Sequence, residues 1–191
     1  MSDYIDAHPT EFAGKSVVEL GAGAGLPSIL ATRAGARHVV CTDYPDEELI
    51  VNIGKNIETL IPAEQRVVCE ATGYLWGASP SDLLARNEGE KYDIVILCDV
   101  VFNHSEHRKL LHSIVDLLQP NGVAWCVFSH YRPWYMDRDL ALLTMAREEF
   151  GFECLFVDEH KYDMIDVEFT NNRSDPEIPK TVFAHQIVFR R

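Results

Sequence analysis

VVELGAGAG, residues 17–25, carries the strongest structural signal in this chain. Its apolar first half predicts a buried strand, and its glycines predict a tight turn into a helix from about Leu26 to Ala34. A second apolar run, His38–Thr42, ends beside the acidic Asp43. This order of strand, glycine turn, helix and strand opens a nucleotide-type α/β fold, whose ligand lies across the carboxyl ends of the strands.

The glycine turn differs from the dinucleotide-binding fingerprint, because Leu26 stands where the third glycine belongs. Glu19 precedes the turn and suits the positive sulphonium and ammonium groups of S-adenosylmethionine better than a pyrophosphate. Asp43 follows Gly21 by 22 residues, where a carboxylate accepts hydrogen bonds from two ribose hydroxyls. A glycine turn also occurs without any ligand. The three features together favour a bound cofactor, and S-adenosylmethionine over a nicotinamide cofactor.

Composition sets limits on the class of protein. The 191 residues fit a single domain, 1–191, and the 47% apolar and 25% charged content is ordinary for a soluble globular protein. No apolar run approaches the roughly 20 residues of a membrane span. The first six residues, MSDYID, lack the features of a secretory signal. We therefore expect a cytoplasmic protein without a membrane partner.

The net charge of -13 argues against a nucleic-acid partner, since phosphate binding needs a basic face. An acidic surface is compatible with a basic protein partner, although many soluble proteins are simply acidic. The cysteines form no CxxC pair and recur every 28 or 29 residues, which fits one per βα unit: Cys41, Cys69, Cys98, Cys126 and Cys154. We expect reduced, largely buried thiols and no metal site.

The hydrophobic pattern predicts alternating strands and helices along the chain. Expected strands are Ser16–Leu20, His38–Thr42, Arg66–Glu70, Tyr92–Leu97 and Val123–Phe128, and expected helices after the first are Asp46–Leu60, His107–Leu118 and Arg138–Phe150. Gln119–Gly122 predicts a turn. Gly151–Glu159 and Thr181–Arg190 predict two final strands, antiparallel because their connection is too short for a crossover helix.

Five segments make the resemblance to a known family specific. They are Val18–Pro27 (VELGAGAGLP), Thr42–Asp46 (TDYPD), Gly73–Gly77 (GYLWG), Asp99–His104 (DVVFNH) and Phe128–Trp134 (FSHYRPW). The chain resembles the fungal N-terminal and lysine methyltransferases that act on translation elongation factor 1-alpha. The resemblance implies a Rossmann-like seven-stranded sheet, mostly parallel with an antiparallel last strand and helices on both faces. It also implies S-adenosylmethionine as cofactor and the elongation factor as protein partner of a monomer.

The resemblance assigns cofactor contacts residue by residue. Gly21, Ala22 and Gly23 would line the methionine end, together with Glu19. Other contacts would come from the ribose-binding Asp43 with Tyr44 beside it, from Trp76 at the adenine, and from Cys98 near the adenosine. Trp76 has an alternative interpretation as a core aromatic residue.

The substrate side is assigned to the segments after the fourth and fifth strands. Asp99 would face the methyl-transfer site and orient the amine, and the surrounding contacts would come from Phe102, His104, Tyr131 and Trp134. Aromatic rings there flank a cationic amine by cation–π contact. Asp99 has an alternative interpretation as a helix N-cap, and His104 as a structural histidine.

Methyl transfer from a sulphonium needs a neutral amine aligned with the methyl carbon. An α-amine has a pKa of about 7.7–8.0 and a lysine about 10.4, so the α-amine loses its proton more easily near neutral pH. The sequence does not identify a general base.

Two departures from the family pattern leave alternatives open. Members of the family carry a further stretch before the first strand, with a tryptophan that helps to cover the cofactor, whereas here no tryptophan precedes Trp76. Phe102 stands where related lysine methyltransferases often have tyrosine. A small-molecule N-methyltransferase of the nicotinamide type and a non-catalytic, shortened domain are therefore alternatives to a protein methyltransferase.

Overall fold

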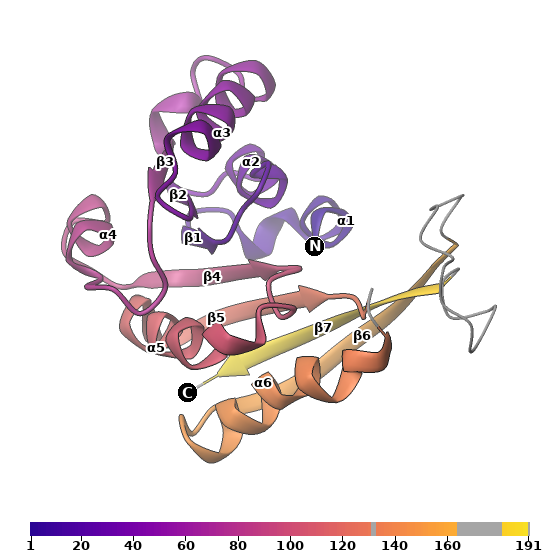
Figure 1. The fold of residues 1–191 in the computed structure, drawn as a ribbon. Helices are drawn as coiled ribbons and strands as arrows, with labels where there is room; N and C mark the ends of the chain where they lie inside the picture. Colours follow the sequence, from indigo (N-terminus) through magenta and orange to yellow (C-terminus); the bar gives the residue numbers. More distant parts are fainter. Residues whose placement is uncertain (131–132, 164–180, 191) are drawn as a thin grey trace.

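The computed structural model describes residues 1–130, 133–163 and 181–190 (Figure 1). Within these residues one sheet has the strand order β3-β2-β1-β4-β5-β7-β6. The strands are β1 (Ser16–Leu20), β2 (His38–Asp43), β3 (Cys69–Gly73), β4 (Tyr92–Cys98), β5 (Leu118–Phe128), β6 (Glu153–Asp163) and β7 (Thr181–Arg190). The first five pair in parallel, which confirms the predicted α/β fold. β7 runs antiparallel to both β5 and β6.

Helices cover both faces of the sheet, as Figure 1 shows. One face carries α1 (Ser2–Ala7), α2 (Leu26–Arg33) and α3 (Glu47–Leu60), and the other carries α4 (Ser81–Arg86), α5 (His107–Leu117) and α6 (Met136–Glu148). The sheet thus separates two apolar clusters, because successive side chains of a strand point to opposite faces. Val17 and Val18 are both fully buried but belong to different clusters. This explains why the central strands are almost wholly apolar.

The third strand was predicted three residues too early. Arg66–Val68 forms a 3-10 turn, and β3 begins at Cys69. The Arg66 side chain donates a 2.7 Å hydrogen bond from Nε to the carbonyl of Ile61, and Val67 is 86% exposed. An apolar side chain that faces solvent therefore produced a false strand signal.

The turn predicted at Gln119–Gly122 is also wrong, since these residues lie within β5. The pairing of β4 with β5 shifts register between Tyr92 and Ile94, next to this segment. A Cβ at Gly122 would lie 2.8 Å from the carbonyl oxygen of Asp93, so glycine lets the strands approach there. The Pro-Asn-Gly sequence consequently marks an irregularity within a strand rather than its boundary.

Two short helices, α1 and α4, were absent from the predicted set of elements. The other helix ends agree with the predicted ones within two residues. Asp46 caps α3, since its side chain accepts hydrogen bonds from the N–H groups of Glu48 and Leu49. None of the helices in the described ranges combines the length and the apolar character that a membrane crossing requires.

Candidate active site

The glycine turn lies at the carboxyl end of β1 and is attached to β2. The N–H groups of Gly21 and Ala22 both donate 2.9 Å hydrogen bonds to the carbonyl of Thr42. Gly21 has a φ of 77°, and a Cβ there would lie 2.8 Å from Val100 Cγ1 and 3.0 Å from Trp76 Cζ2. Glycine at position 21 therefore brings the segments after β1, β3 and β4 together at one point.

Asp43 ends β2 and holds the next part of the same turn. Its Oδ2 accepts a 2.6 Å hydrogen bond from the N–H of Gly23, and its Oδ1 accepts one of 2.6 Å from the N–H of Tyr44. An ionised carboxylate has about four acceptor positions, so two remain for hydroxyl groups such as those of a ribose. The Tyr44 side chain is exposed beside them.

Glu19 is fully buried beneath the turn and connects β1 to α2. Its Oε2 accepts hydrogen bonds from the N–H (3.0 Å) and the hydroxyl (2.6 Å) of Ser28. Burial raises its pKa to about 7, an effect that Asp43 reinforces and the two bonds from Ser28 oppose. Among the described residues, Oε1 has no hydrogen-bond partner. A buried acceptor without a partner is one that a cationic or N–H-bearing group can satisfy. The contact of Glu19 with the amino-acid end of S-adenosylmethionine stays a prediction.

Trp76 and Cys98 flank the turn from β3 and β4. Trp76 is half-buried and packs against the apolar cluster on the α5 side, in keeping with both of its predicted roles, as an adenine contact and as a core aromatic residue. Cys98 ends β4, and burial raises the pKa of its thiol well above the usual value. Cys98 is therefore a packing group rather than a nucleophile, and its contact with adenosine stays a prediction.

Asp99 does not cap the following helix; it joins the segments after β4 and β5. Its Oδ1 accepts hydrogen bonds from the N–H (3.0 Å) and the hydroxyl (3.3 Å) of Ser129, and its own N–H donates to the carbonyl of Val127. Its backbone is left-handed, with a φ of 51°, which is uncommon for a residue other than glycine. Such a conformation is maintained where the surrounding structure requires it, and it often marks a functional site.

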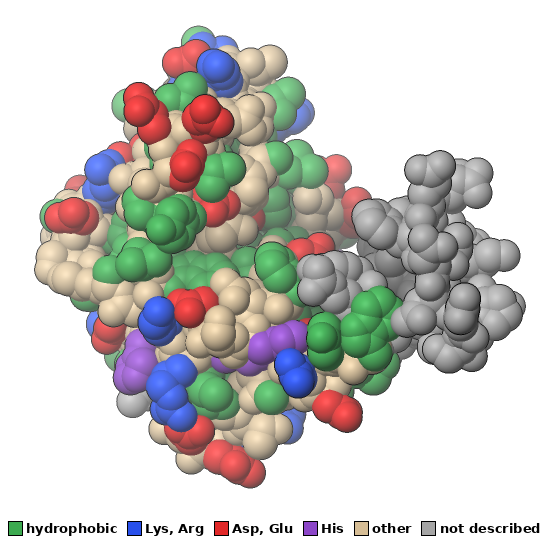
Figure 2. Space-filling view, in the orientation of Figure 1, with side chains coloured by type: hydrophobic (Ala, Val, Ile, Leu, Met, Phe, Trp, Pro, Cys, Tyr) green, Lys and Arg blue, Asp and Glu red, His purple; other side chains and the backbone are tan. Residues whose placement is uncertain are grey.

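The predicted substrate residues differ in their surroundings. Phe102 and Trp134 expose 51% and 59% of their surface. His104 is held by a 2.6 Å hydrogen bond between its Nε2 and the carboxylate of Asp139. Tyr131 lies outside the described residues. Figure 2 shows histidine atoms at the surface beside a group of hydrophobic side chains.

Three polar residues of this region were not predicted from the sequence: Ser129, His130 and Asp139. Ser129 and His130 stand within the FSHYRPW segment, so that segment offered a signal for them. Asp139 lies inside α6 without any recognisable motif, and only the fold brings it to His104. Within the described ranges, no group of three or more His, Cys, Asp or Glu side chains has an arrangement suited to a metal ion.

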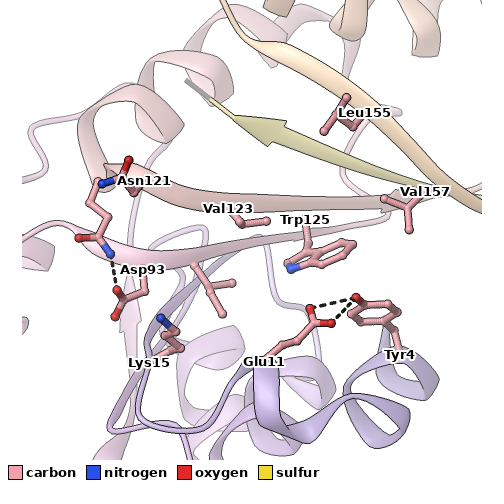
Figure 3. Close-up of a pocket in the computed structure, with 11 residues that line it drawn as sticks. Tyr4, Glu11, Lys15, Asp93, Asn121, Val123, Trp125, Leu155 and Val157 are labelled. Atoms are coloured by element: carbon pink, nitrogen blue, oxygen red, sulfur yellow. Dashed lines mark hydrogen bonds between the residues drawn. The ribbon is translucent and has the colours of Figure 1, made fainter.

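A cavity of about 560 Å³ lies away from these residues (Figure 3). It is lined by residues of the α1 region, by the early parts of β4 and β5, and by β6, among them Tyr4, Lys15, Asp93, Trp125 and Leu155. The Tyr4 hydroxyl donates to the Glu11 carboxylate at one side of it. None of the predicted cofactor or substrate residues contributes to this cavity, which belongs to the amino-terminal half of the central strands.

The parallel core, the glycine turn after β1 and the carboxylate at the end of β2 define an S-adenosylmethionine-dependent methyltransferase. A family model described as lysine methyltransferase matches residues 1–146, and this chain belongs to that family. The resemblance inferred from the sequence is thereby confirmed, as is the predicted cofactor.

Relatives and solved structures agree with this assignment. The protein N-terminal and lysine N-methyltransferase EFM7 of Yarrowia lipolytica is 38% identical over 204 residues, covering 99% of this chain and 74% of that protein. The protein of the same name from Neurospora crassa is 40% identical, covering 95% of this chain and 67% of its own length. A crystal structure of a methyltransferase complexed with S-adenosylhomocysteine superposes with a TM-score of 0.61 at 16% identity, covering 96% of this chain and 49% of the other. That likeness supports the fold.

Proposed function

We propose that this chain transfers methyl groups from S-adenosylmethionine to the N-terminal amine and to an adjacent lysine of translation elongation factor 1-alpha. The observation that carries the proposal is the match to protein N-terminal and lysine N-methyltransferases over nearly the whole chain. The proposal treats residues 1–191 as one methyltransferase domain with the seven-stranded sheet of its class, active as a monomer in the cytoplasm.

The geometry supports this reaction because the predicted contacts converge at the carboxyl ends of the parallel strands. Trp76 and Val100 meet at Gly21, and Asp43 holds Gly23. Glu19 offers an unpaired buried oxygen to an ammonium group, and Asp43 offers acceptor positions to ribose hydroxyls. When bound, the cofactor supplies an activated methyl group next to a positively charged sulphur.

The protein must then orient an amine toward that methyl group. Asp99 sits in the segment after β4, with Oδ1 fixed by Ser129. In this proposal its carboxylate attracts a cationic amine, and the amine makes cation–π contacts with Phe102 and Trp134, whose side chains are exposed. Because Phe102 and Trp134 are exposed, the flexible amino-terminal segment of a protein substrate can reach them. This exposure supports a protein as the substrate.

The test is transfer of isotope-labelled methyl groups to a peptide that copies the amino terminus of the elongation factor. An N-acetylated peptide removes the α-amine, and a peptide with arginine in place of the adjacent lysine removes the second acceptor. The proposal predicts label on the unblocked peptide and a partial loss with each of the two altered peptides.

The same assay separates the alternatives. Label in nicotinamide but not in any peptide would identify a small-molecule methyltransferase. Saturable binding of S-adenosylmethionine without transfer to any acceptor would identify a non-catalytic domain. Either result would overturn the proposed function.

A further inference from the structure

A buried carboxylate lies between two histidines next to the proposed active site. Asp139 Oδ1 is 2.6 Å from His104 Nε2, and Asp139 Oδ2 is 2.7 Å from His130 Nδ1. Their side chains are 6%, 24% and 5% exposed, respectively. The three residues come from the segment after β4, the segment after β5 and helix α6. The binding of the cofactor and the orientation of the amine by Asp99 do not require this cluster.

The arrangement fixes which ring nitrogens carry protons. An ionised carboxylate only accepts hydrogen bonds, so each histidine must present an N–H to Asp139. His104 therefore carries its proton on Nε2, which leaves a lone pair on Nδ1 when the ring is neutral. A carboxylate bound to one nitrogen orients the imidazole and stabilises the imidazolium that forms when the other nitrogen takes a proton. His104 is the more exposed of the two rings.

The cluster is connected to Asp99 through Ser129. Ser129, which binds the Asp99 carboxylate, immediately precedes His130 in the chain. His104 follows Asp99 by five residues. The segments after β4 and β5 are thus joined twice, by Asp99 with Ser129 and by Asp139 with the two histidines. The segment after β4 therefore carries both Asp99 and His104.

Neighbouring aromatic rings connect His104 to the exposed Trp134. The His104 and Tyr135 ring centroids are 5.8 Å apart, and those of Tyr135 and Trp134 are 6.2 Å apart. Trp134 is an exposed side chain. Figure 2 shows histidine atoms at the surface beside hydrophobic side chains. The His104 ring is therefore linked through Tyr135 to an exposed aromatic side chain.

His107 is a poorer candidate for the same task. Its ring lies edge-on to His104 at 5.6 Å, but it is only 2% exposed and its Nε2 is bonded to the carbonyl of Val101 at 2.6 Å. Burial lowers its pKa, which disfavours the charged form that a proton acceptor must reach. Among the histidines of this region, His104 combines exposure with a carboxylate partner.

We propose that His104 Nδ1 accepts the proton of the substrate amine, with Asp139 and His130 as positioning residues. The inference rests on the proposed function. The ammonium of the substrate gives one proton to Nδ1, and the neutral amine then forms a bond from nitrogen to the methyl carbon. The carbon–sulphur bond breaks and its electron pair stays on sulphur. The imidazolium, stabilised by Asp139, releases its proton to solvent.

The test compares His104→Ala with the wild-type chain in three measurements. At saturating peptide and cofactor, kcat should fall about 100-fold or more, while the calorimetric Kd for S-adenosylmethionine stays within about twofold. Added imidazole should restore part of the lost kcat, which the loss of a merely structural side chain would not allow. His112→Ala is the matched control, since His112 lies on α5 with its ring against Phe150 and outside the cluster. It should keep wild-type kcat.

Asp139→Asn tests the positioning role with nearly unchanged volume. It should lower kcat at least tenfold, and imidazole should not restore it, because the ring of His104 still occupies its place. Unchanged kcat in His104→Ala, or a loss of cofactor affinity as large as the loss of kcat, would overturn the proposal.

Nitrogen NMR of the histidine rings at pH 8 gives a readout that is independent of methyl transfer. The proposal predicts the Nε2–H tautomer for His104 in the wild-type chain and a mixture of tautomers in Asp139→Asn. The opposite tautomer, or a fully protonated ring, would refute the proton acceptor whatever the activity. A wild-type chain with the predicted tautomer but no transfer to any amine would refute the proposed function instead, while supporting the arrangement at His104.

Discussion

The carboxylate of Asp43 accepts a 2.6 Å hydrogen bond from the backbone N–H of Gly23, and thereby ties the end of β2 to the glycine turn after β1. Its other oxygen binds the N–H of Tyr44. A single side chain therefore shapes the turn and presents acceptors to a ligand. The ligand-binding surface and the backbone beneath it depend on the same group.

Replacement of Asp43 by Ala should weaken binding of S-adenosylmethionine more than tenfold, because both the ribose acceptors and the Gly23 bond are lost. Calorimetric titration measures this affinity. Asp46→Ala is the control: it removes the cap of α3 and should cost about 1 kcal/mol of stability without changing the affinity. Equal affinity of wild type and Asp43→Ala would remove Asp43 from the cofactor site.

Gly21→Ala and Gly23→Ala form a matched pair. Both positions have a positive φ, but only at Gly21 would the new Cβ meet neighbours, at 2.8 Å from Val100 and 3.0 Å from Trp76. The backbone strain should cost each variant about 1–2 kcal/mol, and overpacking should cost Gly21→Ala about 1–3 kcal/mol more. Urea unfolding gives both free energies. A smaller loss for Gly21→Ala than for Gly23→Ala would contradict the close packing at Gly21.

Glu19 makes stability depend on pH in a defined direction. Burial raises its pKa in the folded chain to about 7 from an ordinary value of 4.5. Between these values the unfolded chain releases a proton that the folded chain retains, so the free energy of unfolding falls as pH rises. The fall is about 3 kcal/mol at about 1.4 kcal/mol per pKa unit and is complete above pH 7.

Glu19→Gln removes this contribution while preserving the side-chain size. Measured by urea unfolding, the stability of the variant relative to wild type should therefore be higher at pH 8 than at pH 5. The comparison between the two proteins cancels the other titrating groups. A difference that is the same at both pH values would show that Glu19 is ionised throughout.

Asp99→Asn isolates the charge at the proposed substrate site. Asparagine tolerates the left-handed backbone and can still accept the hydrogen bonds from Ser129. Methyl transfer to a peptide amine should fall at least tenfold, while the Kd for S-adenosylmethionine changes less than twofold. A parallel loss of both quantities would make Asp99 a cofactor ligand rather than the group that orients the amine.

Much of the parallel core could be predicted because its signals are local. Ser16–Leu20 was predicted with the bounds that β1 has, and the strands at His38 and Tyr92 were each predicted one residue short. Buried strands covered on both faces are nearly continuous apolar runs, so the position of each strand follows from the local run of apolar residues. The short helices α1 and α4 offered too few turns for a helical period to appear.

The site was less predictable, because several of its contacts depend on the fold. Gly21 was found from its motif, but its contact with Trp76 joins residues 55 positions apart. The bond of Glu19 to Ser28 followed from no motif, nor did the meeting of His104 with Asp139. Sequence patterns indicated which residue types serve the chemistry, while the partners of those residues became visible only when the sheet brought its loops together.

The most direct test of the proposed function is mass spectrometry of full-length, unmethylated elongation factor 1-alpha after incubation with this chain and isotope-labelled S-adenosylmethionine. Fragmentation should place the label on the N-terminal amine and on the adjacent lysine, with at least tenfold less label at both in a reaction with Asp99→Asn of the same, short duration. Label confined to other residues, or absent while the chain binds the cofactor, would contradict the account.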